Sequence, residues 1–207
     1  MQPTYEHHFE IRKNKSSPFK YAKGRITGAD VYNWHENIEV LYVTEGEGIF
    51  RYGTEDLSAR AGDLFIINRE AFHQVKSETE IAYSYLIIDE HFCLENGIKT
   101  DALSFVRKLR DRETEALFLA VGEAFLLPKE LPTAIAHRRA AVLALLIRLC
   151  EAHVEGSEVK HEERSPAEEY VKRTVAYLAE HYAEPQSLET LAALSGVTRH
   201  YLARVFK

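Results

Sequence analysis

The sequence predicts an α+β, multidomain chain: an N-terminal antiparallel β-barrel or sandwich, helices that follow it, and an all-α segment at the C-terminus. Residues 25 to about 90 contain short β-branched and aromatic runs separated by glycine-centred turns, which indicates strands. From residue 101 apolar residues recur three to four positions apart, which is the period of a helix. A charged stretch with Gly, Ser and Pro at 155–166 indicates a linker before the last helices.

The strands are expected over residues 38–43, 48–52, 64–67 and 81–88, where β-branched and aromatic residues cluster. Short strands at such close and regular spacing favour a sandwich or barrel over alternating βαβ units. The basic segment that precedes them, through Lys23, is expected to be an N-terminal arm.

Three helices are expected after the strands, over 101–127, 133–153 and 167–182. The first carries one apolar stripe, formed by Leu103, Val106, Leu109, Leu117, Val121 and Phe125. These elements divide the chain into a barrel with its arm (1–95), a helical region (96–154), a linker (155–166) and a partial helical domain (167–207).

Residues 187–207 predict a helix-turn-helix. Ser187 can cap a short helix, Gly196 supplies the positive φ of a tight turn, and Thr198 can cap a second helix. An ordinary αα-hairpin is the alternative. The distribution of charge favours a nucleic-acid partner, because residues 197–207 carry three basic side chains and no acidic one, although the whole chain has a net charge of −6.

The run 187–207 resembles the first helix-turn-helix of the AraC/XylS family of transcriptional regulators, and 170–182 resembles the helix that opens that DNA-binding domain. The resemblance implies sequence-specific DNA binding through the second helix. The implied contact residues are Thr198, Arg199, His200, Ala203, Arg204 and Lys207. Because a second helix-turn-helix follows in that family, the chain is expected to be truncated after Lys207.

Residues 28–75 resemble the two motifs of the cupins, small jelly-roll barrels that hold a metal with His-x-His, Glu and a distant His. Asn33 stands in place of the first His, and period-2 alternation puts it on one strand face with His35. The resemblance implies a cupin-like β-barrel (jelly-roll) that senses a small-molecule effector at its mouth. The effector-binding candidates are Asn33, Trp34, His35, Glu39, Ile66 and His73.

His35, Glu39 and His73 form a ligand set that suits zinc, iron or another divalent ion. The alternative is a metal-free barrel in which these groups line the pocket or hydrogen-bond one another. Because the first His of the motif is replaced, we expect no resident cofactor, and a divalent metal stays the alternative.

The resemblance also implies a homodimer through helices packed beside the barrel. Val142, Leu146 and Leu149 are the interface candidates. Packing against the chain's own barrel requires the same apolar stripe, so both uses stay open.

The longest apolar run, residues 140–147, is far shorter than the roughly 20 residues of a membrane helix. The polar N-terminus is unlike a signal peptide, and the two cysteines form no CxxC pattern. A cytoplasmic protein without a membrane partner is therefore expected.

Together these features predict a ligand-responsive transcriptional regulator, not an enzyme, with DNA and a small molecule as its partners. One alternative is a metal-dependent cupin enzyme, of isomerase or dioxygenase type, that uses His35, Glu39 and His73. The other is a truncated partner that dimerises with a complete regulator and binds no DNA itself.

Overall fold

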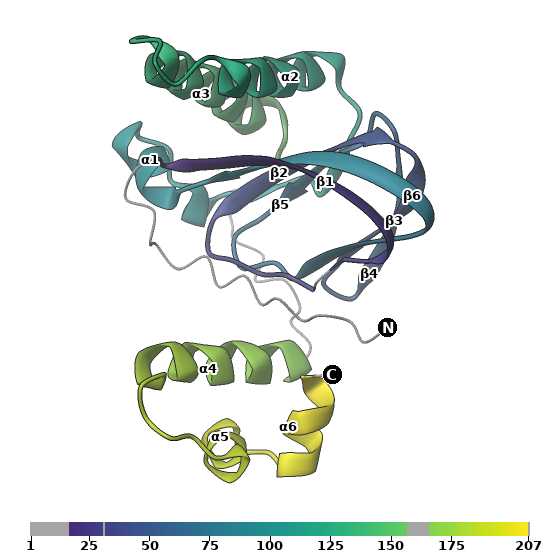
Figure 1. The fold of residues 1–207 in the computed structure, drawn as a ribbon, viewed down its shortest axis with the longest axis vertical. Coiled ribbons are helices and arrows are strands. Elements are labelled where there is room, and N and C mark those ends of the chain that lie inside the picture. The colour runs from purple at the N-terminus through teal and green to yellow at the C-terminus, as the bar shows by residue number, and fades with distance from the viewer. Residues whose placement is uncertain (1–16, 31, 157–165, 207) are drawn as a thin grey trace. The chain divides into compact units, whose positions relative to one another are not determined.

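A computed structural model describes residues 17–30, 32–156 and 166–206, which fall into two compact units that divide between residues 160 and 161. The first unit contains a seven-stranded antiparallel sheet of order β4-β3-β6-β2-β5-β8, with β1 also paired to β6 (Figure 1). The strands are β1 (Phe19–Ala29), β2 (Ile38–Glu45), β3 (Glu47–Tyr52), β4 (Glu55–Arg60), β5 (Leu64–Ile67), β6 (His73–Ile88) and β8 (Lys108–Leu109).

Strand β6 gives the sheet its curvature. Its first residues pair with β3, from Tyr52↔His73 to Ile49↔Lys76, whereas its C-terminal half pairs with both β2 and β1. Strand β6 therefore pairs with different strands along its length, and the sheet bends around it into an antiparallel half-barrel (Figure 1).

Period-2 alternation separates two apolar clusters on the two faces of the sheet. Leu41 and Val43 of β2 lie in the interior cluster of the half-barrel together with Phe50 and Phe65. Their sequence neighbours, such as Val40, lie in the other cluster, which packs against the helices.

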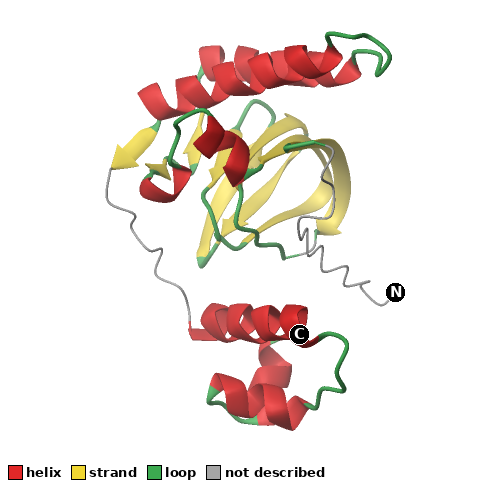
Figure 2. Ribbon diagram, turned by 90° about the vertical axis from the view of Figure 1, so that its left-hand side faces the viewer, coloured by secondary structure: helices red, strands yellow, loops and turns green. Residues whose placement is uncertain are grey.

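Helix α1 (Glu90–Glu95) follows β6, and α2 (Arg112–Leu126) and α3 (Ala134–Ala152) follow β8. Helices α2 and α3 cover the outer face of the sheet (Figure 2). Gly122 of α2 allows this close packing, because a Cβ there would lie 2.7 Å from the Tyr21 hydroxyl oxygen. A short ladder of β7 (Ser104–Phe105) with β9 (Val154–Gly156) ties the start of this region to its end.

The second unit consists of α4 (Pro166–His181), α5 (Leu188–Ser195) and α6 (Arg199–Val205). Ser187 accepts a hydrogen bond from the Thr190 amide, and Thr198 accepts one from the Tyr201 amide, so both predicted helix caps are confirmed. Gly196, with φ of 69°, makes the predicted left-handed turn between the two helices.

The helix expected over 101–127 is wrong in its first third. Residues 100–102 form a 3₁₀ turn, and 104–105 and 108–109 are strands, so the helix begins only at Arg112. Leu109 pairs with Leu64 of β5, because the free edge of β5 supplies the backbone hydrogen-bond partners that a helix would otherwise provide internally.

Strands β1 and β4 are absent from the sequence prediction, and β6 begins eight residues before the expected position. The expected arm through Lys23 overlaps β1, which starts at Phe19, and the expected linker overlaps β9. The remaining parts of the arm and linker, 1–16 and 157–165, lie outside the described residues. In the part of the chain that the structure describes, no helix has the length and apolar character needed to cross a membrane.

Candidate functional site

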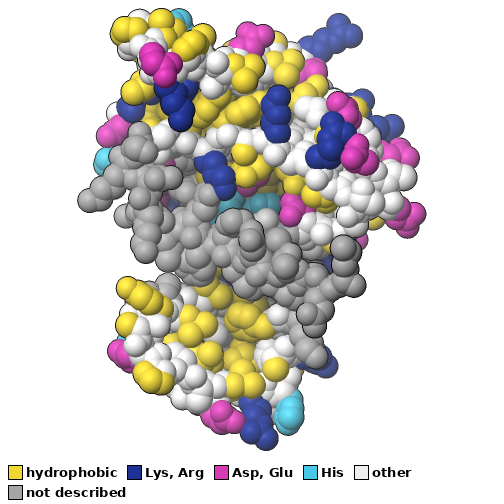
Figure 3. Space-filling model, in the orientation of Figure 1, with side chains coloured by type: hydrophobic (Ala, Val, Ile, Leu, Met, Phe, Trp, Pro, Cys, Tyr) yellow, Lys and Arg dark blue, Asp and Glu magenta, His cyan; other side chains and the backbone are white. Residues whose placement is uncertain are grey.

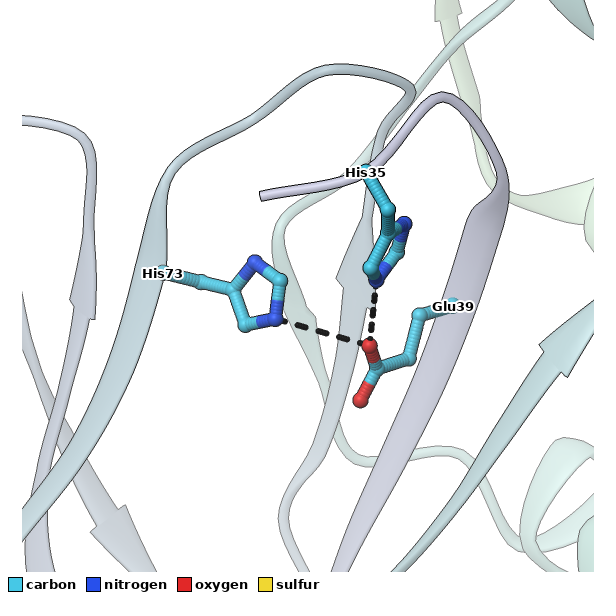
Figure 4. Close-up of side chains that lie close together, drawn as sticks. All are labelled: His35, Glu39 and His73. Atoms are coloured by element: carbon cyan, nitrogen blue, oxygen red, sulfur yellow. Dashed lines mark hydrogen bonds and ion pairs between the residues drawn. The ribbon is translucent and has the colours of Figure 1, made fainter. Parts of the chain in front are cut away.

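Three polar side chains meet in the half-barrel (Figure 4). His35 comes from the loop before β2, Glu39 from β2, and His73 is the first residue of β6. The Glu39 Oε2 atom lies 2.7 Å from His35 Nε2 and 3.4 Å from His73 Nε2. Glu39 and His73 are buried, and Glu39 shares the interior face of β2 with Leu41.

Backbone carbonyls orient both imidazoles. The Nδ1 atom of His35 lies 2.9 Å from the Asn37 carbonyl oxygen, and that of His73 lies 3.0 Å from the Ala71 carbonyl oxygen. Because a carbonyl only accepts, each Nδ1 carries a hydrogen. The Nε2 atom of each ring therefore faces the Glu39 carboxylate.

The buried pair of Glu39 and His73 shifts the pKa of both groups. Burial alone would raise the pKa of Glu39, but hydrogen bonds from His35 and His73 outweigh it and lower that pKa to about 2. Burial would lower the pKa of His73, and the Glu39 carboxylate outweighs it and raises that pKa. In the metal-free protein the pair is held in its ionised form.

The same three residues fit a divalent metal. Their ligand atoms lie within 4.8 Å of one another. Metal-bound histidines commonly donate their second ring nitrogen to a backbone carbonyl or carboxylate, which is the arrangement of His35 and His73 here. Asn33, in place of a third histidine, contributes a backbone bridge to His73.

Two loops, 32–37 and 68–72, hold the site residues in place. Glu70 has φ of 61°, a conformation that costs energy for a residue with a side chain, and its amide donates to the His35 carbonyl oxygen at 2.7 Å. Trp34 packs against Phe72, with ring centroids 5.9 Å apart, so side chains also join the two loops. No sequence pattern singled out Glu70 or Phe72, because their role depends on a contact between loops.

A second polar contact was also missed from the sequence. The Tyr83 hydroxyl donates to the Asp30 carboxylate, and burial together with that carboxylate raises the pKa of Tyr83. Tyr83 lies across β1, because Gly24 leaves room: a Cβ at Gly24 would lie 2.4 Å from the Tyr83 ring.

Ile66 does not lie in this site. It belongs to the helix-facing cluster, directly opposite Val40, so it points away from Glu39. The strand expected over Asn33 and His35 is also corrected, because Asn33 forms one isolated bridge and the residues between it and β2 are irregular. Trp34 is half-buried beside the site.

The predicted interface residues Val142, Leu146 and Leu149 are fully buried in the helix-facing cluster. They pack against the chain's own sheet, which is the alternative that the sequence left open. They are therefore not available to a second copy.

The residues expected to contact DNA lie on α6 and at its two ends, beginning with the N-cap Thr198. Arg199 is exposed and pairs with Glu189 at 2.9 Å, and the Arg204 guanidinium lies over the Tyr201 ring. Thr198 and His200 are exposed and Ala203 is half-buried. Lys207 lies outside the described residues.

A family model for the AraC-like ligand binding domain matches residues 28–164, so the chain belongs to this family. No curated protein matches the chain.

Several solved structures are similar to parts of the chain. A Photorhabdus luminescens protein is 22% identical with a TM-score of 0.35, over 42% of this chain and 76% of its own. A Thermotoga maritima protein described as a predicted oxalate decarboxylase is 23% identical with a TM-score of 0.32, over 33% and 64%. A Bacteroides fragilis cupin protein is 15% identical with a TM-score of 0.34, over 35% and 67%.

Proposed function

We propose that the protein is a ligand-responsive, sequence-specific DNA-binding transcriptional regulator whose effector binds at the cluster of His35, Glu39 and His73. The family match over 28–164 carries this proposal. Glu39 and His73 are buried polar groups in an otherwise apolar interior, and such groups give a small-molecule site its orientation and specificity.

The DNA-binding half of the proposal is supported by the capped turn between α5 and α6. Gly196 and Thr198 give that turn a defined geometry, and Leu202 is buried so that the opposite side of α6 faces solvent. That side carries His200 and Arg204, and α6 itself contains no acidic residue, as suits a helix that enters a major groove.

Selection of binding sites from random DNA, followed by titration of the selected duplex at several salt concentrations, tests this half. Arg204→Ala is expected to weaken DNA binding, because one phosphate or base contact is lost. The slope of log K against log salt concentration should fall in magnitude by about one if that contact is to a phosphate. Lys129→Ala, an exposed change outside the second unit, is the matched control. If the wild-type chain selects no DNA sequence, and Arg204→Ala leaves the salt dependence of DNA binding unchanged, α6 is not the helix that contacts the bases.

A homodimer is proposed through the outer face of α2 and α3, in place of the buried residues first expected. Hydrophobic side chains are visible over these helices in Figure 3. By exposed fraction, the large hydrophobic residues on α2 and α3 that face solvent are Leu119, Leu126, Ile135 and Ile147.

A metal-dependent role is the second candidate, favoured by the convergence of two Nε2 atoms on one carboxylate. His35, Glu39 and His73 would hold the ion, which would supply a Lewis acid beside the interior. Titration of chelator-treated protein with Co²⁺ alone tests this. A ligand-field absorption band that is lost in His73→Ala supports it, and no band at saturating Co²⁺ excludes it.

A further inference from the structure

Arg69 lies between the candidate site and helix α1. Its Nε donates to the Glu36 carbonyl oxygen at 2.8 Å, while Nη1 and Nη2 lie 2.8 Å and 3.1 Å from the two carboxylate oxygens of Glu90. The two side chains are only 23% and 24% exposed. The planar guanidinium therefore contacts a site loop and α1 at once, which the point charge of a lysine does not reproduce.

The loop that contains Arg69 also makes hydrogen bonds to both histidines of the site. The next residue, Glu70, donates its amide to the His35 carbonyl oxygen, and the Ala71 carbonyl accepts from His73 Nδ1. A ligand that displaces the His73 imidazole therefore acts on the Ala71 carbonyl, two residues from Arg69, and one that shifts the His35 backbone acts on the Glu70 amide.

Helix α1 connects in turn to two other elements. Phe92 packs edge-on against Phe19, the first residue of β1, with ring centroids 4.5 Å apart. The guanidinium of Arg139 from α3 lies 4.9 Å from the centre of the same Phe92 ring, and its Nη2 lies 3.4 Å from Glu95 Oε2. Helix α1 thus touches both the start of β1 and α3.

We propose that Arg69 is a positioning residue that couples the candidate site to α1, and through α1 to the start of β1 and to α3. The inference rests on the proposed function, because it names the route by which an occupied site reaches the helices. The route consists of the Arg69–Glu90 ion pair and the Phe92 contacts on α1.

Two native reporters make the coupling measurable without a ligand. Trp34, the single tryptophan of the chain, packs on Phe72 and reports the contact between the two site loops. Cys93 is fully buried in α1, and burial raises its pKa to about 11, so a thiol reagent labels it only when α1 opens. Cys150→Ser leaves Cys93 as the sole thiol.

In the Cys150→Ser chain, Arg69→Gln and Glu90→Gln are each expected to shift Trp34 emission and to speed Cys93 labelling about fivefold, because one partly buried ion pair is lost. Arg69→Lys is expected to behave like Arg69→Gln, because an ammonium group cannot contact both Glu90 carboxylate oxygens and the Glu36 carbonyl at once. Glu95→Gln, on the same helix but outside the route to the loops, is the control and should leave Trp34 emission unchanged. Labelling rates are corrected for global stability measured by urea unfolding.

A double-mutant cycle distinguishes coupling of the site to α1 through Arg69 from a general loss of stability in each variant. His35→Asn is expected to speed labelling of Cys93 when Arg69 is present and to add nothing in the Arg69→Gln chain. Additive effects of His35→Asn and Arg69→Gln on the labelling rate would overturn the proposal. So would a Glu90→Gln chain whose Trp34 emission is the same as that of the Glu95→Gln control. A chain that shows coupling but binds no effector would overturn the proposed function alone.

Discussion

Glu39 sits between two imidazoles with little access to solvent, so its charge contributes to stability only while a partner carries the opposite charge. Its pKa is lowered in the folded protein, so its contribution is complete above about pH 4.5, the ordinary value, and is lost as the pH falls toward about 2. The pKa of His73 is raised, so its contribution is complete below pH 6.5 and is lost as the pH rises past its folded value.

The difference in free energy of unfolding between the wild-type chain and Glu39→Gln is therefore expected to peak between pH 4.5 and 6.5. The expected maximum is about 3 kcal/mol, because removing one partner leaves a buried charge uncompensated. Urea unfolding of chelator-treated protein from pH 3 to 9 measures it. A difference that stays constant over this range would show that the pair is not ionised.

Gly24 is a residue whose missing side chain has a defined use. Gly24→Ala is expected to destabilise the fold by about 1–3 kcal/mol, because the new Cβ would lie 2.4 Å from the Tyr83 ring. In a Tyr83→Leu background the same substitution should cost much less, since the ring is gone. Equal costs in the two backgrounds, measured by urea unfolding, would contradict the contact.

Individual site residues were predictable where they match a family motif. The resemblance to the two cupin motifs indicated His35, Glu39 and His73, which the structure brings together. Ile66 was placed on the wrong face, because the face of β5 is set by its register with β2, in which Ile66 lies opposite Val40. Such register depends on a long-range pairing that no local pattern in 64–67 contains.

At the scale of elements, the sequence predicted those whose pattern is local. The strand over 64–67 was predicted with its bounds, and α3 was predicted to within one residue at each end. The stretch 103–109 was taken for helix, because a strand formed by docking to the edge of β5 can have apolar residues at a helix-like spacing. Strand β1 was missed, since its inward positions include Ala22 and Gly24, which have low strand propensity.

Neighbouring residues of α3 should separate packing from association. Leu146→Ala is expected to lower the free energy of unfolding by about 2–5 kcal/mol, because its side chain is fully buried in the helix-facing cluster. Ile147→Ala, at a residue 44% exposed, should cost little stability and instead weaken self-association. Urea unfolding and sedimentation equilibrium on both variants measure the two effects. A dimer that Ile147→Ala and Ile135→Ala leave unchanged would place the interface elsewhere.

At the scale of the whole molecule, charge is divided unevenly between the two units. The chain has a net charge of −6, yet residues 166–207 contain five basic and five acidic side chains, so the negative charge belongs to the first 165 residues. The average over the chain therefore conceals a C-terminal unit compatible with nucleic acid, whereas the family match lies within 28–164.

Ligand-dependent stabilisation of the full chain tests the central claim, that the cluster around Glu39 is the effector site. Thermal unfolding is followed by Trp34 emission across sugars, small organic acids, short peptides and divalent metal salts. We predict a compound that raises the melting temperature of the wild-type chain and of Arg204→Ala but has no effect on Glu39→Gln. A compound that stabilises wild type and Glu39→Gln equally would contradict the account.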